Sequence, residues 1–269
     1  MSLGSNTDST TVESKEQLVT WFRTACVAEE DLLAGAEHEK PPFYLDNNEP
    51  VPYIGVDGRK GIKDFLKKMA ADYGWEPEYE AGNITALKKD GMSWSLEPGG
   101  QLETGGAPYN NIHLNAQETD KVIAEGVKVA EELGFGLLAL GYHPTHNGET
   151  MPRMPRPRYD TIRQYMIKKK FPHGLDSMFC TSTAQVNLGY TSEEDMVQKL
   201  RVALCLQPIA VALFANSPFK DGEPSGYDSY RSHVIHNNMG GRYGFMLPVV
   251  FEEGFGFERF VDYAMNEMP

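Results

Sequence analysis

The pattern of apolar and polar positions along the chain predicts a series of amphipathic helices. In segment 61–73, one helical face carries Ile62, Phe65, Leu66 and Met69, which is the spacing of a helix packed on a core. The same periodicity predicts helices over 15–26, 111–133, 158–166, 192–213 and 258–265. Pro208 should kink or interrupt the long helix over 192–213, because proline lacks a backbone donor and clashes with the preceding turn.

Alternating and continuous apolar runs predict strands between these helices. Segments 83–87 and 92–96 are short strands separated by Asp90-Gly91, a dipeptide typical of hairpin turns. Further strands are expected within 135–142, 181–190 and 246–251. Hairpin strands mixed with helices, without a clear linker, predict a single α+β domain over 15–269. Residues 1–14 are polar, and we expect them to form a disordered tail.

Composition and charge exclude several classes of function. The chain has 269 residues, 25 Lys and Arg against 38 Asp and Glu, and a formal net charge of −13. This acid excess argues against binding nucleic acid or an anionic membrane surface, both of which require clustered cations. No uninterrupted apolar run reaches about 18 residues, so we expect no segment that spans a membrane. We therefore expect a cytoplasmic protein.

The cysteines and the first residues of the chain lead to the same location. The three cysteines, Cys26, Cys180 and Cys205, are widely spaced, which predicts reduced thiols rather than disulfides. Cys180 and Cys205 lie in apolar segments, so we expect both to be buried and inert. The N-terminal residues have neither the apolar core of a secretion signal nor the Arg-rich composition of a transit peptide.

Two acidic motifs are candidates for metal binding. In AEHEK, Glu37 and Glu39 would point to one face of a strand and His38 to the other. Two aligned carboxylates repel each other unless a cation lies between them, and oxygen pairs suit Mg²⁺ or Mn²⁺. In LEPGGQLE, Glu97 and Glu103 share a face if the segment is extended. The alternatives are a solvated strand edge and an exposed glycine-rich loop.

Amides and arginines complete the set of candidate residues. Gln185 and Asn187 alternate with apolar residues in the strand over 181–190, so they could orient phosphate or metal-bound water, or they could simply be exposed. The proline-rich segment 151–159 should be neither helix nor central strand. Arginines concentrate in and just after it, at Arg153, Arg156, Arg158 and Arg163. With Arg231 in YRSH they could bind carboxylates through a planar fork, or form surface salt bridges.

The order of these motifs resembles glutamate–cysteine ligase of the plant and proteobacterial type. The motifs are AEHEK, SLEPGGQLETGGAP, MPRMPRPRYDTIRQYM, TSTAQVNLGYTSEEDMVQKLRVAL, LQPIAVALFANSPF, YRSH and MLPVVFEEGFGFERFVDYA, which together extend from about Glu37 to Ala264. The resemblance implies a glutamine synthetase-like fold, in which a curved antiparallel sheet forms an open funnel with helices outside. It also implies an ATP-dependent enzyme that joins the γ-carboxylate of glutamate to the amine of cysteine through γ-glutamyl phosphate. That reaction is the first step of glutathione biosynthesis.

The resemblance also implies residue roles. Glu37, Glu39, Glu97 and Glu103 would bind Mg²⁺, or Mn²⁺ in its place. Gln185 and Asn187 would lie near the metal, the ATP or the substrate. Arg158 and Arg231 would hold substrate glutamate and stabilise the transferring phosphoryl group. Small molecules are the expected partners, together with a possible second copy in a homodimer.

Two departures from the family pattern leave alternatives open. After YRSH the family has a tryptophan and an aspartate-rich segment, whereas this chain has His233, His236, Asn237 and Asn238 in that region. Family members also continue beyond this point, so the chain resembles the N-terminal portion of a C-terminally truncated enzyme with an incomplete sheet. The alternatives are a γ-glutamyl ligase for another amine and a non-catalytic fragment that binds glutamate or ATP.

Overall fold

The computed structural model describes residues 11–238 and 247–266, and most of the expected N-terminal tail lies outside them. The helices are α1 (Lys15–Thr24), α2 (Ile62–Tyr73), α3 (Ile112–Glu132), α4 (Pro157–Lys169), α5 (Gly174–Phe179), α6 (Glu193–Leu213), α7 (Tyr230–His236) and α8 (Phe257–Asn266), with 3₁₀ turns η1 (Glu29–Asp31) and η3 (Pro248–Phe251). The strands are β1 (Ala34–Lys40), β2 (Pro42–Tyr44), β3 (Glu76–Glu80), β4 (Asn83–Lys89), β5 (Met92–Leu96), β6 (Leu102–Gly105), β7 (Phe135–Leu137), β8 (Ala184–Leu188), β9 (Phe219–Lys220) and β10 (Glu223–Pro224). The architecture is α+β, as the sequence predicts.

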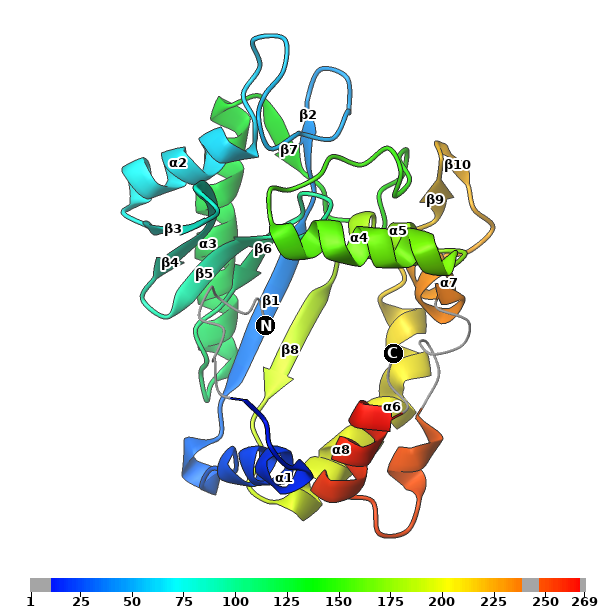
Figure 1. Ribbon diagram of the computed structural model, residues 1–269. Helices are drawn as coiled ribbons and strands as arrows, with labels where there is room; N and C mark the ends of the chain where they lie inside the picture. The colour runs from blue at the N-terminus through cyan, green and yellow to red at the C-terminus, as the bar shows by residue number, and fades with distance from the viewer. Residues whose placement is uncertain (1–10, 239–246, 267–269) are drawn as a thin grey trace.

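The central element is a six-stranded sheet in the order β3-β4-β5-β6-β1-β8. Every pairing in it is antiparallel. Two further pairs, β2 with β7 and β9 with β10, stand apart from it. Strands β1 and β8 run side by side through the middle of the molecule (Figure 1) although about 150 residues separate them in sequence.

The β4–β5 hairpin fixes which side chains face the core. Asp90 and Gly91 both have positive φ, at 49° and 82°, as a tight two-residue hairpin turn requires. The resulting register turns Trp94 toward helices α2 and α3 and its neighbour Ser95 toward the opposite face. Trp94 is fully buried and meets Phe65 edge-on, with ring centroids 5.5 Å apart.

Helix α3 packs closely on the sheet because Gly126 has no side chain. A Cβ atom at that position would lie 2.8 Å from the Trp94 ring, closer than real Cβ contacts allow. The core between helices and sheet includes Ile62, Leu66, Met69, Leu87, Leu96 and Leu102. The predicted apolar face of segment 61–73 is therefore confirmed as the face that α2 buries.

Helix α6 differs most from the expectations. It runs unbroken through Pro208, and of its residues only Val197 is buried. By length and composition alone it could cross a membrane, with a mean hydropathy of 1.4 over the window tested and none of that window buried. The helix passes this test although its apolar run is interrupted by Lys199 and Arg201. A core helix of a water-soluble protein passes the same test.

The exposed helix also overturns one expectation about the cysteines. Cys180 is buried, and burial raises the pKa of its thiol far above the ordinary value, so its predicted burial is confirmed. Cys205 is exposed, because no other described element covers its side of α6. All three cysteines are free thiols.

Two predicted strands are shorter or absent. Within segment 246–251, Pro248–Phe251 form the 3₁₀ turn η3, in which Pro248 lies in the first turn with its fixed φ. Within 135–142 only Phe135–Leu137 is a strand. Beyond it, the backbone amides of Leu138 and Gly141 donate to the carbonyls of Pro41 and Asn216, which belong to separate segments.

Candidate functional site

Strand pairing brings the predicted acidic residues to one face of the sheet. Glu39 on β1 lies directly opposite Glu103 on β6, and Glu103 lies opposite Ser95 on β5. On the other side of β1, Glu37 lies opposite Gln185 on β8. Because side chains of paired residues share a face, these residues project away from the helical core.

Hydrogen bonds hold each of these carboxylates in place. Glu39 accepts a bond of 2.9 Å from the backbone amide of Thr183. Glu103 accepts bonds from the Ser95 hydroxyl at 3.0 Å and the Gln185 amide at 3.4 Å. The Asn187 amide donates to Glu37 at 2.9 Å. The two amides predicted to share a face on β8 therefore both contact the acidic residues.

Glu97 reaches the same group from the turn between β5 and β6. Its backbone amide bonds to the carbonyl of Gln101 at 2.9 Å, so the segment is a hairpin rather than a continuous extended strand. The Gln101 side chain accepts from the Gly99 amide at 2.8 Å and donates to the Thr181 carbonyl at 2.7 Å. The turn is thereby tied to the segment that leads into β8.

Burial and the charges of neighbouring carboxylates raise the pKa values of three of these acids. Burial, followed by the charges of Glu97 and Glu103, raises the pKa of Glu39 to about 8. Burial and the charge of Glu103 raise the pKa of Glu97 to about 7. The pKa of Glu103 is also raised, mainly by burial and further by Glu37, although its bond from Ser95 opposes the shift. Such a set of buried, mutually repelling acids is typical of functional sites.

The two predicted arginines occupy different environments. Arg231, at the start of α7, lies close enough to Glu39 for its charge to lower the pKa of that acid. Its Nε atom is buried and has no hydrogen-bond partner among the described residues. Arg158 is exposed near the start of α4, over the Tyr159 ring, and its charge acts to lower the pKa of Glu97. Both arginines therefore belong to the surroundings of the acidic face, but only Arg231 is enclosed.

Arg156, two residues before Arg158, is the buried arginine of the proline-rich segment. Its guanidinium forms an ion pair with Glu80 at 2.8 Å and donates to the Leu96 carbonyl at 3.3 Å. The Tyr159 hydroxyl donates to the same carbonyl. Arg156 therefore fixes the start of the turn that carries Glu97.

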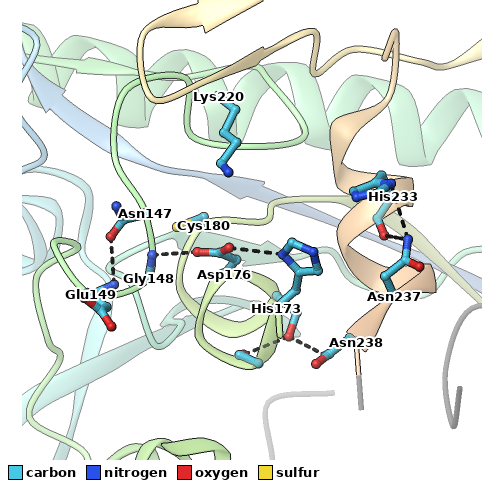
Figure 2. A network of polar contacts seen from close by, with 12 residues as sticks. Asn147, Gly148, Glu149, His173, Asp176, Cys180, Lys220, His233, Asn237 and Asn238 are labelled. Atoms are coloured by element: carbon cyan, nitrogen blue, oxygen red, sulfur yellow. Dashed lines mark hydrogen bonds and ion pairs between the residues drawn. The ribbon is translucent and has the colours of Figure 1, made fainter. Parts of the chain in front are cut away.

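A polar network anchors the helix that carries Arg231 (Figure 2). Asp176 on α5 accepts from the Gly148 amide at 2.9 Å and contacts the His173 ring at 3.4 Å. Asn238, just after α7, is buried and donates to the Ser177 hydroxyl at 2.6 Å. One of the residues that depart from the expected acidic segment therefore connects α7 to α5.

A cavity of about 670 Å³ lies beside Glu39. Strand β1, the start of β8, helix α6 and helix α7 all contribute to its wall, through residues that include Gln185, Gln207 and Arg231. The acidic face therefore borders an open cavity of the size that small-molecule sites have.

The donor chemistry of this face suits a hard divalent cation. Among residues 11–238 and 247–266, no three His, Cys, Asp or Glu side chains are already gathered closely enough to enclose a metal ion. The acids nevertheless offer only oxygen donors, and burial raises the pKa values of Glu39, Glu97 and Glu103 although nearby arginines oppose the shifts. Mg²⁺ and Mn²⁺ prefer such ligands.

Comparison with known proteins identifies the family. A family model described as glutamate-cysteine ligase family 2 (GCS2) matches residues 33–267. The chain belongs to this ligase family. It is 44% identical over 253 residues to glutamate–cysteine ligase A, chloroplastic, of Oryza sativa subsp. japonica, covering 94% of this chain and 50% of the relative. The chloroplastic glutamate–cysteine ligases of Nicotiana tabacum and Arabidopsis thaliana are 44% and 42% identical, each covering 94% of this chain and 47% of the relative.

The chain therefore spans about half the length of these ligase relatives. Their names also correct the expected location, because each of these relatives is called chloroplastic. The cytoplasmic expectation is wrong. It rested on dispersed cysteines and the composition of residues 1–14, and reduced thiols are compatible with any reducing compartment.

Ser95, which holds Glu103 directly, is absent from the sequence-based set. Thr183, which holds Glu39 through its backbone amide, lies in the strand segment that carries Gln185 and Asn187. Ser95 precedes Glu97 by two residues in β5, so strand alternation could have indicated it. No signal in the sequence distinguishes Arg156, which is buried, from Arg158, which is exposed.

The first prediction concerns the turn that positions Glu97 in this ligase-family member. A Cβ atom on Gly99 would lie 1.9 Å from the Phe179 carbonyl oxygen, so Gly99→Ala must displace the turn or α5. We expect a loss of about 1–3 kcal/mol in the free energy of unfolding, as for other overpacked sites, measured by urea denaturation. Gly35→Ala is the control, because its Cβ would meet only the Gly106 carbonyl at an ordinary 3.8 Å. Equal stability of the two variants would show that the turn is not tightly packed.

A second prediction concerns pH. The pKa of Glu39 is about 8 in the folded chain against 4.5 for a free side chain, so the folded state binds more protons than the unfolded state between these values. The free energy of unfolding of metal-free protein should therefore fall as pH rises from about 4.5 to about 8, by on the order of 4 kcal/mol. Urea denaturation in a chelator at pH 5 and pH 8 measures this, and Glu39→Gln should reduce the fall. A stability that rises over this range would contradict the electrostatics described above.

Proposed function

We propose that this chain acts in the ATP-dependent ligation of the glutamate γ-carboxylate to the amine of cysteine through γ-glutamyl phosphate, the first step of glutathione biosynthesis. The observation that carries the proposal is the sheet face on which Glu37, Glu39 and Glu103 lie, with Glu97 in the adjoining turn and Arg231 close to Glu39. The relatives' names support the choice of substrates.

The four acids are proposed to hold Mg²⁺, or Mn²⁺, together with ATP. When bound, the cations would neutralise the phosphates and polarise the group being transferred. The chain's own residues set up this chemistry. Thr183 and Ser95 orient Glu39 and Glu103, and the amides of Gln185 and Asn187 fix the neighbouring oxygens. Because this order exists before binding, little reorganisation is needed when charge develops.

The arginines are proposed to bind substrate glutamate. Arg231 offers a buried, unpartnered Nε atom beside the cavity, which suits a carboxylate that arrives from solution. Arg158 would approach from α4 on the side of Glu97, because its charge already acts to lower the pKa of Glu97. Positioning of this kind, rather than acid–base chemistry, supplies most of the catalysis in phosphoryl transfer.

The sheet is proposed to be part of a glutamine synthetase-like funnel. In support, the helices α2 and α3 cover one face of an antiparallel sheet, and the acids gather on the other face. A second candidate function is binding of glutamate or ATP without turnover. It is favoured by the exposure of every residue of β8 at the end of the sheet.

Turnover and binding can be measured separately. Incubation of the chain with ATP, Mg²⁺, glutamate and cysteine should yield γ-glutamylcysteine, detected by mass spectrometry, with stoichiometric phosphate release. Calorimetric titration with Mg²⁺–ATP and with glutamate tests binding. Binding without product would support the second candidate, product only with another amine would correct the acceptor, and neither binding nor product would reject both functions. Arg231→Gln should weaken glutamate binding, whereas the exposed Arg153→Gln should not.

A further inference from the structure

The peptide group that leads into Glu97 is held on both sides. Its carbonyl, that of Leu96, accepts hydrogen bonds from the Arg156 guanidinium at 3.3 Å and from the Tyr159 hydroxyl. Its amide, that of Glu97, donates to the Gln101 carbonyl at 2.9 Å. A peptide group is planar, so bonds to both its oxygen and its N–H fix the plane from which the Glu97 side chain departs. The direction of this carboxylate is therefore set partly by residues at the start of α4.

The side chain of Arg156 makes three polar contacts at once. Its Nε atom donates to Glu80, the last residue of β3, at 2.8 Å, and its Nη1 atom donates to the Leu96 carbonyl and to the Tyr159 hydroxyl, both at 3.3 Å. Arg156 is 6% exposed, and its guanidinium lies over the Tyr159 ring at 5.3 Å from the ring centre. A lysine ammonium is a point charge and lacks this planar fork. Arg156 therefore ties β3, β5 and α4 together at one carbonyl.

The sequence explains why Arg156 keeps this position. It lies between Pro155 and Pro157, and a residue that precedes proline is restricted to extended backbone. Arg156 has φ −119° and ψ 121°, within that range, and is the N-cap of α4. Pro157 follows at the start of the helix, where its missing N–H is not needed. The guanidinium therefore projects from a stiff segment of the backbone.

We propose that Arg156 and Tyr159 are positioning residues, which direct the Glu97 carboxylate toward the other acids and so determine how tightly the acidic face binds Mg²⁺ or Mn²⁺. This inference rests on the proposed function, in which Glu97 is one of the metal ligands, and deepens it. Neither residue contacts the metal in this scheme. Both act through the Leu96 carbonyl, and Glu80 acts through Arg156.

The test uses substitutions that change little besides these hydrogen bonds. Arg156→Lys keeps the charge, which also acts on Glu97 and Glu103, but loses the fork, and Tyr159→Phe removes only the hydroxyl. Each should weaken Mg²⁺ binding to the whole chain about tenfold or more, the usual effect of losing support for a metal ligand, as measured by calorimetry. The EPR spectrum of bound Mn²⁺ should change in both variants. Arg153→Lys, at an exposed position of the same segment, is the matched control and should behave like wild type.

A double-mutant cycle separates positioning of Glu97 from a general weakening of the fold. If Arg156 acts through Glu97, Arg156→Lys should have little further effect on Mg²⁺ affinity in the Glu97→Gln background. An effect through overall stability or long-range charge would persist there. A full tenfold loss in that background would overturn the proposal, and so would unchanged Mg²⁺ affinity in both Arg156→Lys and Tyr159→Phe.

Hydrogen exchange in metal-free protein distinguishes failure of this inference from failure of the proposed function. If wild type does not bind Mg²⁺, the metal role proposed for the acids is rejected, and exchange then decides whether the turn is positioned. The amides of Glu97 and Gly100 close the turn through bonds of 2.9 Å, so they should exchange at least about tenfold faster in Arg156→Lys and Tyr159→Phe than in wild type. Unchanged exchange at these two amides would overturn the positioning role even if Mg²⁺ binds.

Discussion

Glu103→Gln should weaken the binding of Mg²⁺ by at least about 100-fold and leave the metal-free fold no less stable than wild type. Loss of a residue that only supports a metal ligand costs about 10–100-fold in affinity, so loss of a ligand should cost more. The substitution keeps the size of the side chain and its bond with Ser95. It also removes one of the charges that raise the pKa of Glu39 and Glu97.

The measurement is the rise in melting temperature with added Mg²⁺, which reports binding to the folded state, supported by calorimetry. Glu131→Gln is the matched control, because Glu131 is exposed on α3 at the opposite face of the sheet. If Glu103→Gln responds to Mg²⁺ as wild type does, Glu103 is not a ligand and the metal site must be placed elsewhere.

Trp94→Ala should lower the free energy of unfolding by about 3–5 kcal/mol, the usual cost of removing a large buried aromatic ring. Trp94 is fully buried between Phe65 and the close approach of α3 at Gly126, so little can move into the space that it leaves. Urea denaturation measures the effect. Trp21→Ala is the control: Trp21 is 65% exposed, and its removal should change stability by less than about 0.5 kcal/mol.

This second substitution also tests the link between core and site. Ser95, which holds Glu103, is the next residue along β5. Loosening the core side of that strand should therefore reduce the stabilisation by Mg²⁺ in addition to lowering intrinsic stability. A loss of less than about 1 kcal/mol would mean that α3 can close onto the sheet, contrary to the tight packing seen at Gly126.

Local rules were sufficient for much of the fold. Helical periodicity identified α2 with its buried face, and Asp90-Gly91 identified the β4–β5 hairpin. Strand alternation placed Glu37 and Glu39 on one face of β1. These features depend on neighbours within a few residues, which the sequence displays directly.

Features that depend on distant partners could not be derived from the sequence. Pairing of β1 with both β6 and β8 creates the acidic face, and nothing local specifies it. Arg156 and Arg158 occur in the same motif, but only the direction of α4 on the sheet decides which is buried. Helix α6 has the composition of a core helix and is nevertheless exposed, so the expected burial of Cys205 was wrong.

The alternation of charge along β1 has a consequence for how this gene can change. Its acids face one side of the sheet and its His and Lys the other, so inserting or deleting a single codon within 34–40 would exchange the two sides. The carboxylates of Glu37 and Glu39 would then face helices α2 and α3, and the ammonium of Lys40 would face the acidic residues. Point substitutions in this strand should therefore be tolerated far more often than changes in its length.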